Sequence, residues 1–92
     1  MERRDSVRRE VAQPIRIQPM GAKDGYFDEI TTTLNNSRRG IAFASRLAVF
    51  YMGMQVRVTY PYTATVKVNH TGRIIRIEKL DENFQRIVVK LE

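Results

Sequence analysis

The sequence contains no cysteine and no tryptophan, and it has a single histidine, His70. Without thiols, disulfide bonds and cysteine-based catalysis are excluded, and the composition fits a reducing compartment. One histidine without cysteine cannot assemble a histidine-based catalytic triad or a cluster of zinc ligands. The adjacent Asp81 and Glu82 have no second carboxylate placed opposite them by any sequence pattern. We therefore expect a binding module, not an enzyme, without a cofactor or a metal.

The chain also lacks a long hydrophobic run. No apolar stretch approaches the roughly 20 residues that a membrane span needs, and no apolar signal region follows Met1 to Asp5. We expect a soluble, cytoplasmic protein that does not contact membranes. A chain of 92 residues suffices for one domain with its own core and is too short for two. It fits a whole protein and one domain of a longer protein equally well.

Acidic residues are missing from Ile30 to Ile77, within a chain of net charge +6. The basic residues inside that stretch are Arg38, Arg39, Arg46, Arg57, Lys67, Arg73 and Arg76. A continuous positive field raises the local concentration of an anionic partner and speeds its arrival. The same residues form an ordinary solvated basic surface if their strands direct them apart. Composition alone leaves both interpretations open.

Period-two alternation of apolar and polar residues dominates the chain, and no segment keeps a helical period beyond two turns. The pattern predicts strands around 15–18, 26–35, 41–44 and 56–60, then at 64–69, 72–80 and 86–91, with 45–51 as a loop. Six or seven short strands with turns between them predict an all-β fold. We expect a small antiparallel barrel, since closure removes exposed strand edges.

Several local expectations follow from this pattern. In the second strand, Ile30, Thr32 and Leu34 should face the core, which directs Asn35 outward. His70 should lie in a turn between two later strands. Residues 1–10 are dense in charge and nearly lack apolar side chains, so we expect a flexible, arginine-rich lead-in segment there, and the barrel at 11–92.

Two short motifs lie on either side of the first predicted strands. Arg4 and Arg8 are four residues apart, and each guanidinium can grip a phosphate through paired hydrogen bonds or stack on a purine. Asn35, Ser37 and Gly40 form the second motif at a strand end. There an amide, a hydroxyl and a flexible backbone can meet the edge of a base.

In this order the motifs resemble the two signatures of the PilZ domain, the bacterial receptor module for cyclic di-GMP. These signatures are RxxxR and, further along the chain, [D/N]xSxxG. The similarity continues weakly through the alternating segments 11–17, 40–43, 53–58 and 72–77, so it covers nearly the whole chain. Asn35 stands where the family more often has aspartate, and Arg86 precedes the last strand where the family usually has a glycine.

The resemblance implies a PilZ-like split barrel whose RxxxR segment becomes ordered over the barrel when cyclic di-GMP binds, and which then signals to a downstream protein partner. It assigns Arg4 and Arg8 to the phosphates and guanine faces, and Asn35 and Ser37 to the guanine edge. Gly40 would permit a close backbone approach and any positive φ that the turn requires. The flanking residues Arg3, Arg9, Arg38 and Arg39 are candidates for binding a second ligand molecule.

Two other functions remain open. A basic barrel can bind single-stranded nucleic acid, with arginines along the backbone and aromatic residues stacked on bases. Because strand parity places Phe43 and Tyr60 in the core, few rings remain for stacking, and we do not expect nucleic acid as the main partner. A PilZ-type adaptor that recognises a protein without any nucleotide is the second alternative.

Overall fold

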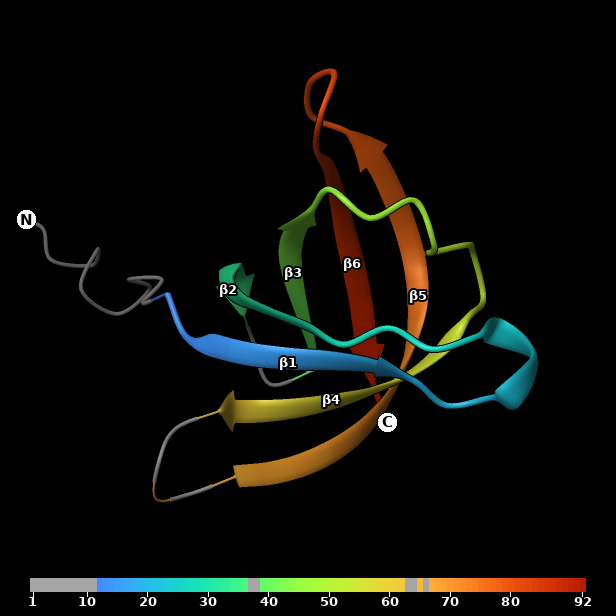
Figure 1. Ribbon diagram of the computed structural model, residues 1–92. Helices are drawn as coiled ribbons and strands as arrows, with labels where there is room; N and C mark the ends of the chain where they lie inside the picture. Colours follow the sequence, from blue (N-terminus) through green and yellow to red (C-terminus); the bar gives the residue numbers. More distant parts are fainter. Residues whose placement is uncertain (1–11, 37–38, 63–64, 66) are drawn as a thin grey trace, which may run out of the picture.

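A computed structural model describes residues 12–92, except 37–38, 63–64 and 66. Antiparallel strands close into a barrel in the order β1-β2-β3-β6-β5-β4 (Figure 1). The elements are β1 (Pro14–Pro19), the 3-10 turn η1 (Ala22–Asp24), β2 (Glu29–Asn36), β3 (Gly40–Ser45), β4 (Gln55–Tyr62), β5 (Lys67–Lys79) and β6 (Gln85–Leu91). The prediction of a small, all-β antiparallel barrel is confirmed.

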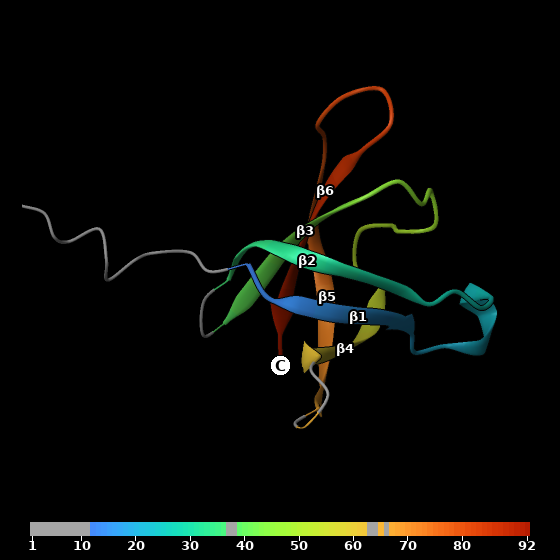
Figure 2. The same ribbon diagram turned by 60° about the vertical axis from the view of Figure 1, so that its left-hand side comes forward.

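The barrel has two layers that cross steeply. β1, β2 and β4 run across β3 and β6, as both views show (Figures 1 and 2). β5 belongs to both layers, because its first half pairs with β4 and its second half pairs with β6. Steep crossing is the orthogonal form of sheet packing, in which a strand that changes layer makes the corner.

The corner of β5 is at Gly72. A Cβ atom at this position would overlap Cγ1 of Val89, so only glycine lets the strand pass so close to β6. The sequence pattern had predicted two strands here, with His70 in a turn between them. That prediction is wrong, because His70 lies within β5, opposite Val58. The sequence pattern placed Gly72 at the start of a strand, but Gly72 is the bend within one continuous strand.

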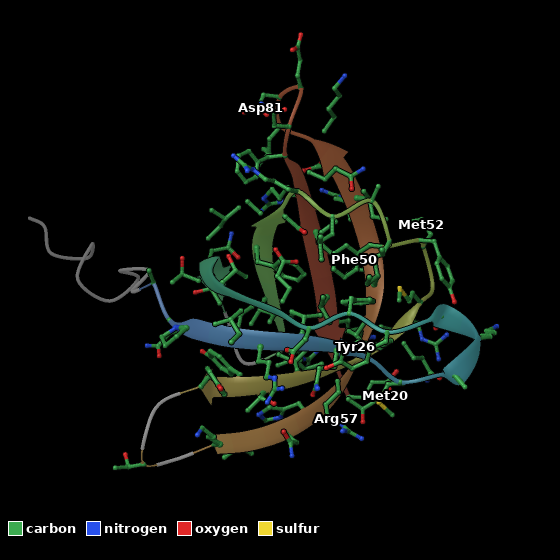
Figure 3. All side chains as sticks on the ribbon, in the orientation of Figure 1. Met20, Tyr26, Phe50, Met52, Arg57 and Asp81 are labelled. Carbon is green, nitrogen blue, oxygen red and sulfur yellow. The ribbon has the colours of Figure 1, made fainter. Side chains whose placement is uncertain are left out.

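The core lies between the two layers. Its buried members are Ile15, Ile17, Phe27, Ile41, Phe43, Phe50, Met54, Val56, Val58, Ile74, Ile87 and Val89. Phe43 is fully buried and Tyr60 packs against this cluster, as strand parity predicted. The loop after β3 contributes Phe50, whose ring meets Phe27 and Phe43 edge-to-face at centroid distances of 5.3 and 5.7 Å (Figure 3). Such contacts add to the stabilisation that burial alone provides.

β2 has the opposite phase to the one predicted. The expected core face was Ile30, Thr32 and Leu34, but Ile30 is 58% exposed and Leu34 is 46% exposed. Thr33 faces inward instead and is 3% exposed. The prediction for this strand is therefore wrong, and two apolar side chains remain on the outer surface of β2.

No helix in the described part of the chain is long and apolar enough to cross a membrane.

Candidate functional site

The β2–β3 hairpin carries the predicted ligand residues that the structure describes, which are Asn35, Arg39 and Gly40. The other predicted ligand residues, Arg3, Arg4, Arg8, Arg9, Ser37 and Arg38, lie outside the described residues, as does the predicted lead-in segment 1–10. The site is therefore built from the hairpin and from the strands that hold it.

Asn35 faces outward because of a bulge. The register between β2 and β3 shifts between Thr33 and Asn35, so that Thr33 opposes Phe43 in the core and Asn35 opposes Ala42, whose own side chain is buried. Asn35 is exposed. Its predicted outward direction is thus confirmed, although Leu34 does not face the core as that prediction assumed. An amide that faces solvent beside a small residue can reach the edge of a bound base.

Gly40 allows β3 to lie very close to β6. A Cβ atom on Gly40 would be 2.9 Å from the carbonyl oxygen of Val89. The backbone N–H of Leu91 donates to the carbonyl of Arg39 at 2.8 Å and fastens the same strand end. Among the described residues only Gly25 and Gly53 have positive φ, so Gly40 does not. This close approach is made to another strand of the same chain, whereas the predicted approach of the Gly40 backbone to a ligand stays a prediction.

The described chain enters the barrel beside the end of β2. The N–H of Gln13 donates to Oγ1 of Thr33 at 3.0 Å, and the N–H of Thr33 donates to the carbonyl of Gln13 at 2.9 Å. These bonds also satisfy the buried hydroxyl. In both views the start of β1 lies next to the end of β2 (Figures 1 and 2). Gln13 is therefore held two residues from Asn35.

Four of the described basic residues between Ile30 and Ile77 make separate local contacts. Arg76 is 3.5 Å from Glu78 and Arg73 is 3.6 Å from Glu92. The Arg46 guanidinium lies 5.1 Å from the ring centroid of Phe84, and the Lys67 amine lies 5.1 Å from that of Tyr62. Each contact is local to its own strands or loops, so the field is distributed over the barrel.

Among the described residues, the shortest ion pair joins β1 to the segment before β2. Arg16 donates to both carboxylate oxygens of Asp28, with Nε 2.7 Å from Oδ1. These hydrogen bonds lower the pKa of Asp28 below its ordinary value and raise the pKa of Arg16. A guanidinium used in this way ties β1 to the segment that precedes β2, which is a structural role.

Hollows in the described surface lie away from the hairpin. One of about 260 Å³ is lined by Arg46, Leu47, Ala48, Lys79, Asp81, Glu82, Asn83, Phe84 and Gln85. Figure 3 places Asp81 at the tip of the β5–β6 loop that borders it. Another of about 240 Å³ is lined by Gly21, Lys23, Asp24, Tyr51, Met52, Gly53, Gln55 and Arg73. Neither of these two hollows is lined by Asn35, Arg39 or Gly40.

The sequence reasoning missed one residue at the hairpin, Lys90. It is exposed and lies opposite Gly40 in the β3–β6 pair. Lys90 is far from Gly40 in the chain, and only the register of the two strands brings them together. The alternation around Val89 would have indicated an outward direction for Lys90, but not its neighbour.

Comparisons with known proteins support the architecture. No protein-family model matches the sequence. An uncharacterized protein of Staphylococcus epidermidis is 31% identical over 81 residues, which cover 76% of this chain and 30% of that protein. The structure of the Bacillus subtilis inhibitor of motility, MotI/DgrA, a PilZ-domain protein, matches with a TM-score of 0.64 and 17% identity.

The chain has a PilZ-like fold. The match to MotI/DgrA covers 91% of this chain, so it includes nearly all of the PilZ-like barrel. It covers 40% of the B. subtilis protein, and the chain thus spans well under half the length of both proteins it matches. At this level of identity the likeness concerns the arrangement of strands, and the PilZ-like hairpin must be judged on its own residues.

Proposed function

We propose that this chain is a receptor domain for cyclic di-GMP. The observation that carries the proposal is the pair of hydrogen bonds between Gln13 and Thr33, which holds the chain following the RxxxR motif beside the end of β2. The second motif begins at Asn35, only two residues further. The chain that follows the first motif and the start of the second motif thus lie close together on the barrel, which supports the proposal.

The lengths of chain involved support this arrangement. Arg8 precedes Gln13 by five residues, which extend over at most about 17 Å. Asn35 lies about 7 Å beyond Thr33 along the strand direction. The long arginine side chain adds to this reach. The Arg8 guanidinium and the exposed amide of Asn35 are therefore able to contact one ligand of dinucleotide size.

The motifs supply the groups that a cyclic dinucleotide requires. Arg4 and Arg8 pair with a phosphate or with guanine O6 and N7, or stack on the base. Asn35 and Ser37 accept from and donate to the guanine edge, and Gly40 keeps the hairpin against β6. Charge-assisted contacts of this number are of the order needed for micromolar affinity, about 8 kcal/mol. A second ligand molecule would use Arg3, Arg9, Arg38 and Arg39.

In this proposal the chain is a binding module in the bacterial cytoplasm and not an enzyme. Ligand binding orders the RxxxR segment against the barrel, and the changed surface is read by a downstream protein partner. The signal is the altered surface itself, so the domain needs no catalytic group.

Titration calorimetry with cyclic di-GMP tests the proposal directly. We expect saturable micromolar binding, no comparable binding of the linear GMP dinucleotide, and a stoichiometry that distinguishes one ligand molecule from two. Arg8→Ala should weaken binding at least about tenfold, since it removes a charge-assisted contact. The matched control is Arg46→Ala, which removes one positive charge at the opposite end of β3 from Gly40.

Two results would contradict the proposal. One is the lack of both binding heat and thermal stabilisation at high ligand concentration, which would favour an adaptor that binds a protein alone. The other is tighter binding of single-stranded oligonucleotides with a steep loss of affinity as salt rises. An extended nucleic acid releases many counterions on binding and a dinucleotide releases few.

A further inference from the structure

The outer face of the barrel next to the hairpin carries two positive charges on neighbouring strands. Lys90 is the cross-strand neighbour of Gly40 on β3 and of Arg73 on β5. Val89, which precedes Lys90, and Ile74, which follows Arg73, are buried in the core. Lys90 and Arg73 therefore point to the outer face. Both are exposed. A row across β3, β6 and β5 thus joins Gly40 of the second motif to the positively charged Lys90 and Arg73.

Lys90 has no ion-pair partner among the described residues. Arg73 has a carboxylate, Glu92, at 3.6 Å, but this pair is half exposed and therefore weak. Directly opposite residues on one face have Cβ atoms about 5 Å apart, and like charges in that position destabilise a sheet. The folded barrel therefore places two like charges on neighbouring strands beside Gly40, and a bound anion would reduce their repulsion.

The position of this pair complements that of the arginine motif. Neighbouring strands are about 4.8 Å apart, so Lys90 lies one step and Arg73 two steps from Gly40, on the side away from β2. Gln13, after which the described chain enters β1, lies on the β2 side. Cyclic di-GMP has two phosphodiesters on opposite sides of its ring. A ligand at the hairpin would therefore have Lys90 and Arg73 on the side away from β2.

We propose that Lys90, supported by Arg73, binds a phosphodiester of the ligand on the outer face of β6, next to Gly40. This inference rests on the proposed function and adds residues to it that belong to neither sequence motif. The barrel wall becomes part of the binding site, not merely the support for the hairpin.

Calorimetry of Lys90→Ala with cyclic di-GMP tests this inference. We expect about tenfold weaker binding, the loss that one charge-assisted contact predicts, without a lower melting temperature of the ligand-free protein. Lys90→Arg should retain most of the affinity because it keeps the charge. The matched control is Lys79→Ala, an exposed lysine at the far end of β5 beside Gln85, about 17 Å along β6 from Lys90. The affinity of Lys79→Ala for cyclic di-GMP should stay within about twofold of wild type, since charges that far apart are largely screened.

The outcomes separate this inference from the proposed function. Wild-type affinity in Lys90→Ala, together with lost affinity in Arg8→Ala, would overturn the role of Lys90 and leave the receptor proposal intact. An equal loss in Lys90→Ala and Lys79→Ala would also overturn it, because the effect would then come from net charge. No binding by the wild-type protein would overturn both. Arg73→Ala is a second test, for which we expect a smaller loss than for Lys90→Ala.

Discussion

At the two ends of the β5–β6 pair, basic residues have cross-strand neighbours of different charge. At the end near the hairpin, Lys90 and Arg73 oppose each other with one carboxylate 3.6 Å from Arg73. Toward the other end, Arg86 lies opposite Glu78, which accepts from it at 3.3 Å and from Arg76 at 3.5 Å. The inner face of both ends is the same apolar core. The difference is therefore confined to the outer surface, where it costs little stability and can be used for binding.

Side chains on the inner face stabilise the barrel, whereas side chains on the outer face are available for contacts with a ligand. The core side chains of β6 alternate with the charged ones, so a change in one face can be made without disturbing the other. Substitutions of buried side chains should affect the stability of both ends of the β5–β6 pair equally. Substitutions on the outer face should affect only the end that carries them. The following predictions test this separation, beginning with the largest expected effect.

Replacing Ile87 by alanine should destabilise the whole barrel. Ile87 is fully buried between Phe43 on β3 and Ile77 on β5, and large-to-small changes at such positions cost about 2 to 5 kcal/mol. Urea denaturation should show this loss with an unchanged slope. Val88→Ala, at the next residue on the half-buried outer side, should cost clearly less. Similar losses for the two variants would contradict the separation of faces.

Replacing Gly40 by alanine should affect only the hairpin end. Its Cβ atom would lie 2.9 Å from the backbone oxygen of Val89, which cannot move without disturbing the β3–β6 pairing. We expect a loss of about 1 to 3 kcal/mol in the free energy of unfolding, the usual range for overpacking. Hydrogen exchange should localise the weakened amides to the ends of β3 and β6 that meet here. A variant as stable as wild type, with unchanged exchange, would show that the strands are not so tightly joined.

The far end of β3 should respond to pH through Glu29. Its carboxylate accepts a hydrogen bond from Ser45 Oγ at 2.7 Å, but partial burial dominates and raises its pKa above the ordinary value. A raised pKa in the folded state gives stability that is present at low pH and is lost as pH rises through that pKa. Relative to Glu29→Gln, the wild-type protein should thus lose stability as pH rises above about 4.5, the ordinary pKa of glutamate, and through the raised pKa of the folded state. Parallel profiles for the two proteins would contradict this assignment. Asp28, whose pKa is lowered, acts with the opposite sign and is retained in both proteins.

The smallest effects concern the surface charges themselves. In the absence of ligand, Lys90→Gln should stabilise the barrel slightly and Glu78→Gln should destabilise it slightly, each by about 0.5 kcal/mol or less. Added salt should reduce both differences, because it screens exposed charges. Melting curves at low and high salt measure this. Changes of the same sign in both variants would remove the contrast between the two ends.

The sequence predicted the class of fold and most strands, because alternation reports directly on which positions are buried. It failed at β2, where Ile30 and Leu34 are more apolar than Thr31 and Thr33 and therefore appeared to be the inner face. Thr33 is buried because Gln13 bonds to its hydroxyl, a contact between distant residues that no local pattern contains. The bulge beside Asn35 then returns the amide to the surface.

The remaining errors and omissions have the same physical origin. Gly72 has the composition of a turn, but its role is set by Val89, which lies on another strand. Lys90 carries no motif, and its place beside Gly40 follows from the register of β3 and β6 alone. Periodicity predicts which face a residue occupies. Cross-strand neighbours require the register, and the register is determined by the whole barrel.

The attachment of Gln13 to Thr33 has a quantitative consequence for any contact that the N-terminal arginines make with the hairpin. It fixes one end of a tether, so the backbone of Arg8 cannot lie farther than about 17 Å from Gln13, whatever path the intervening residues take. Confinement of that kind corresponds to an effective concentration in the millimolar range or above. A guanidinium contact far too weak to form between separate molecules would then be substantially occupied. Loosening the Gln13–Thr33 attachment would lower that occupancy without changing any ligand-facing atom.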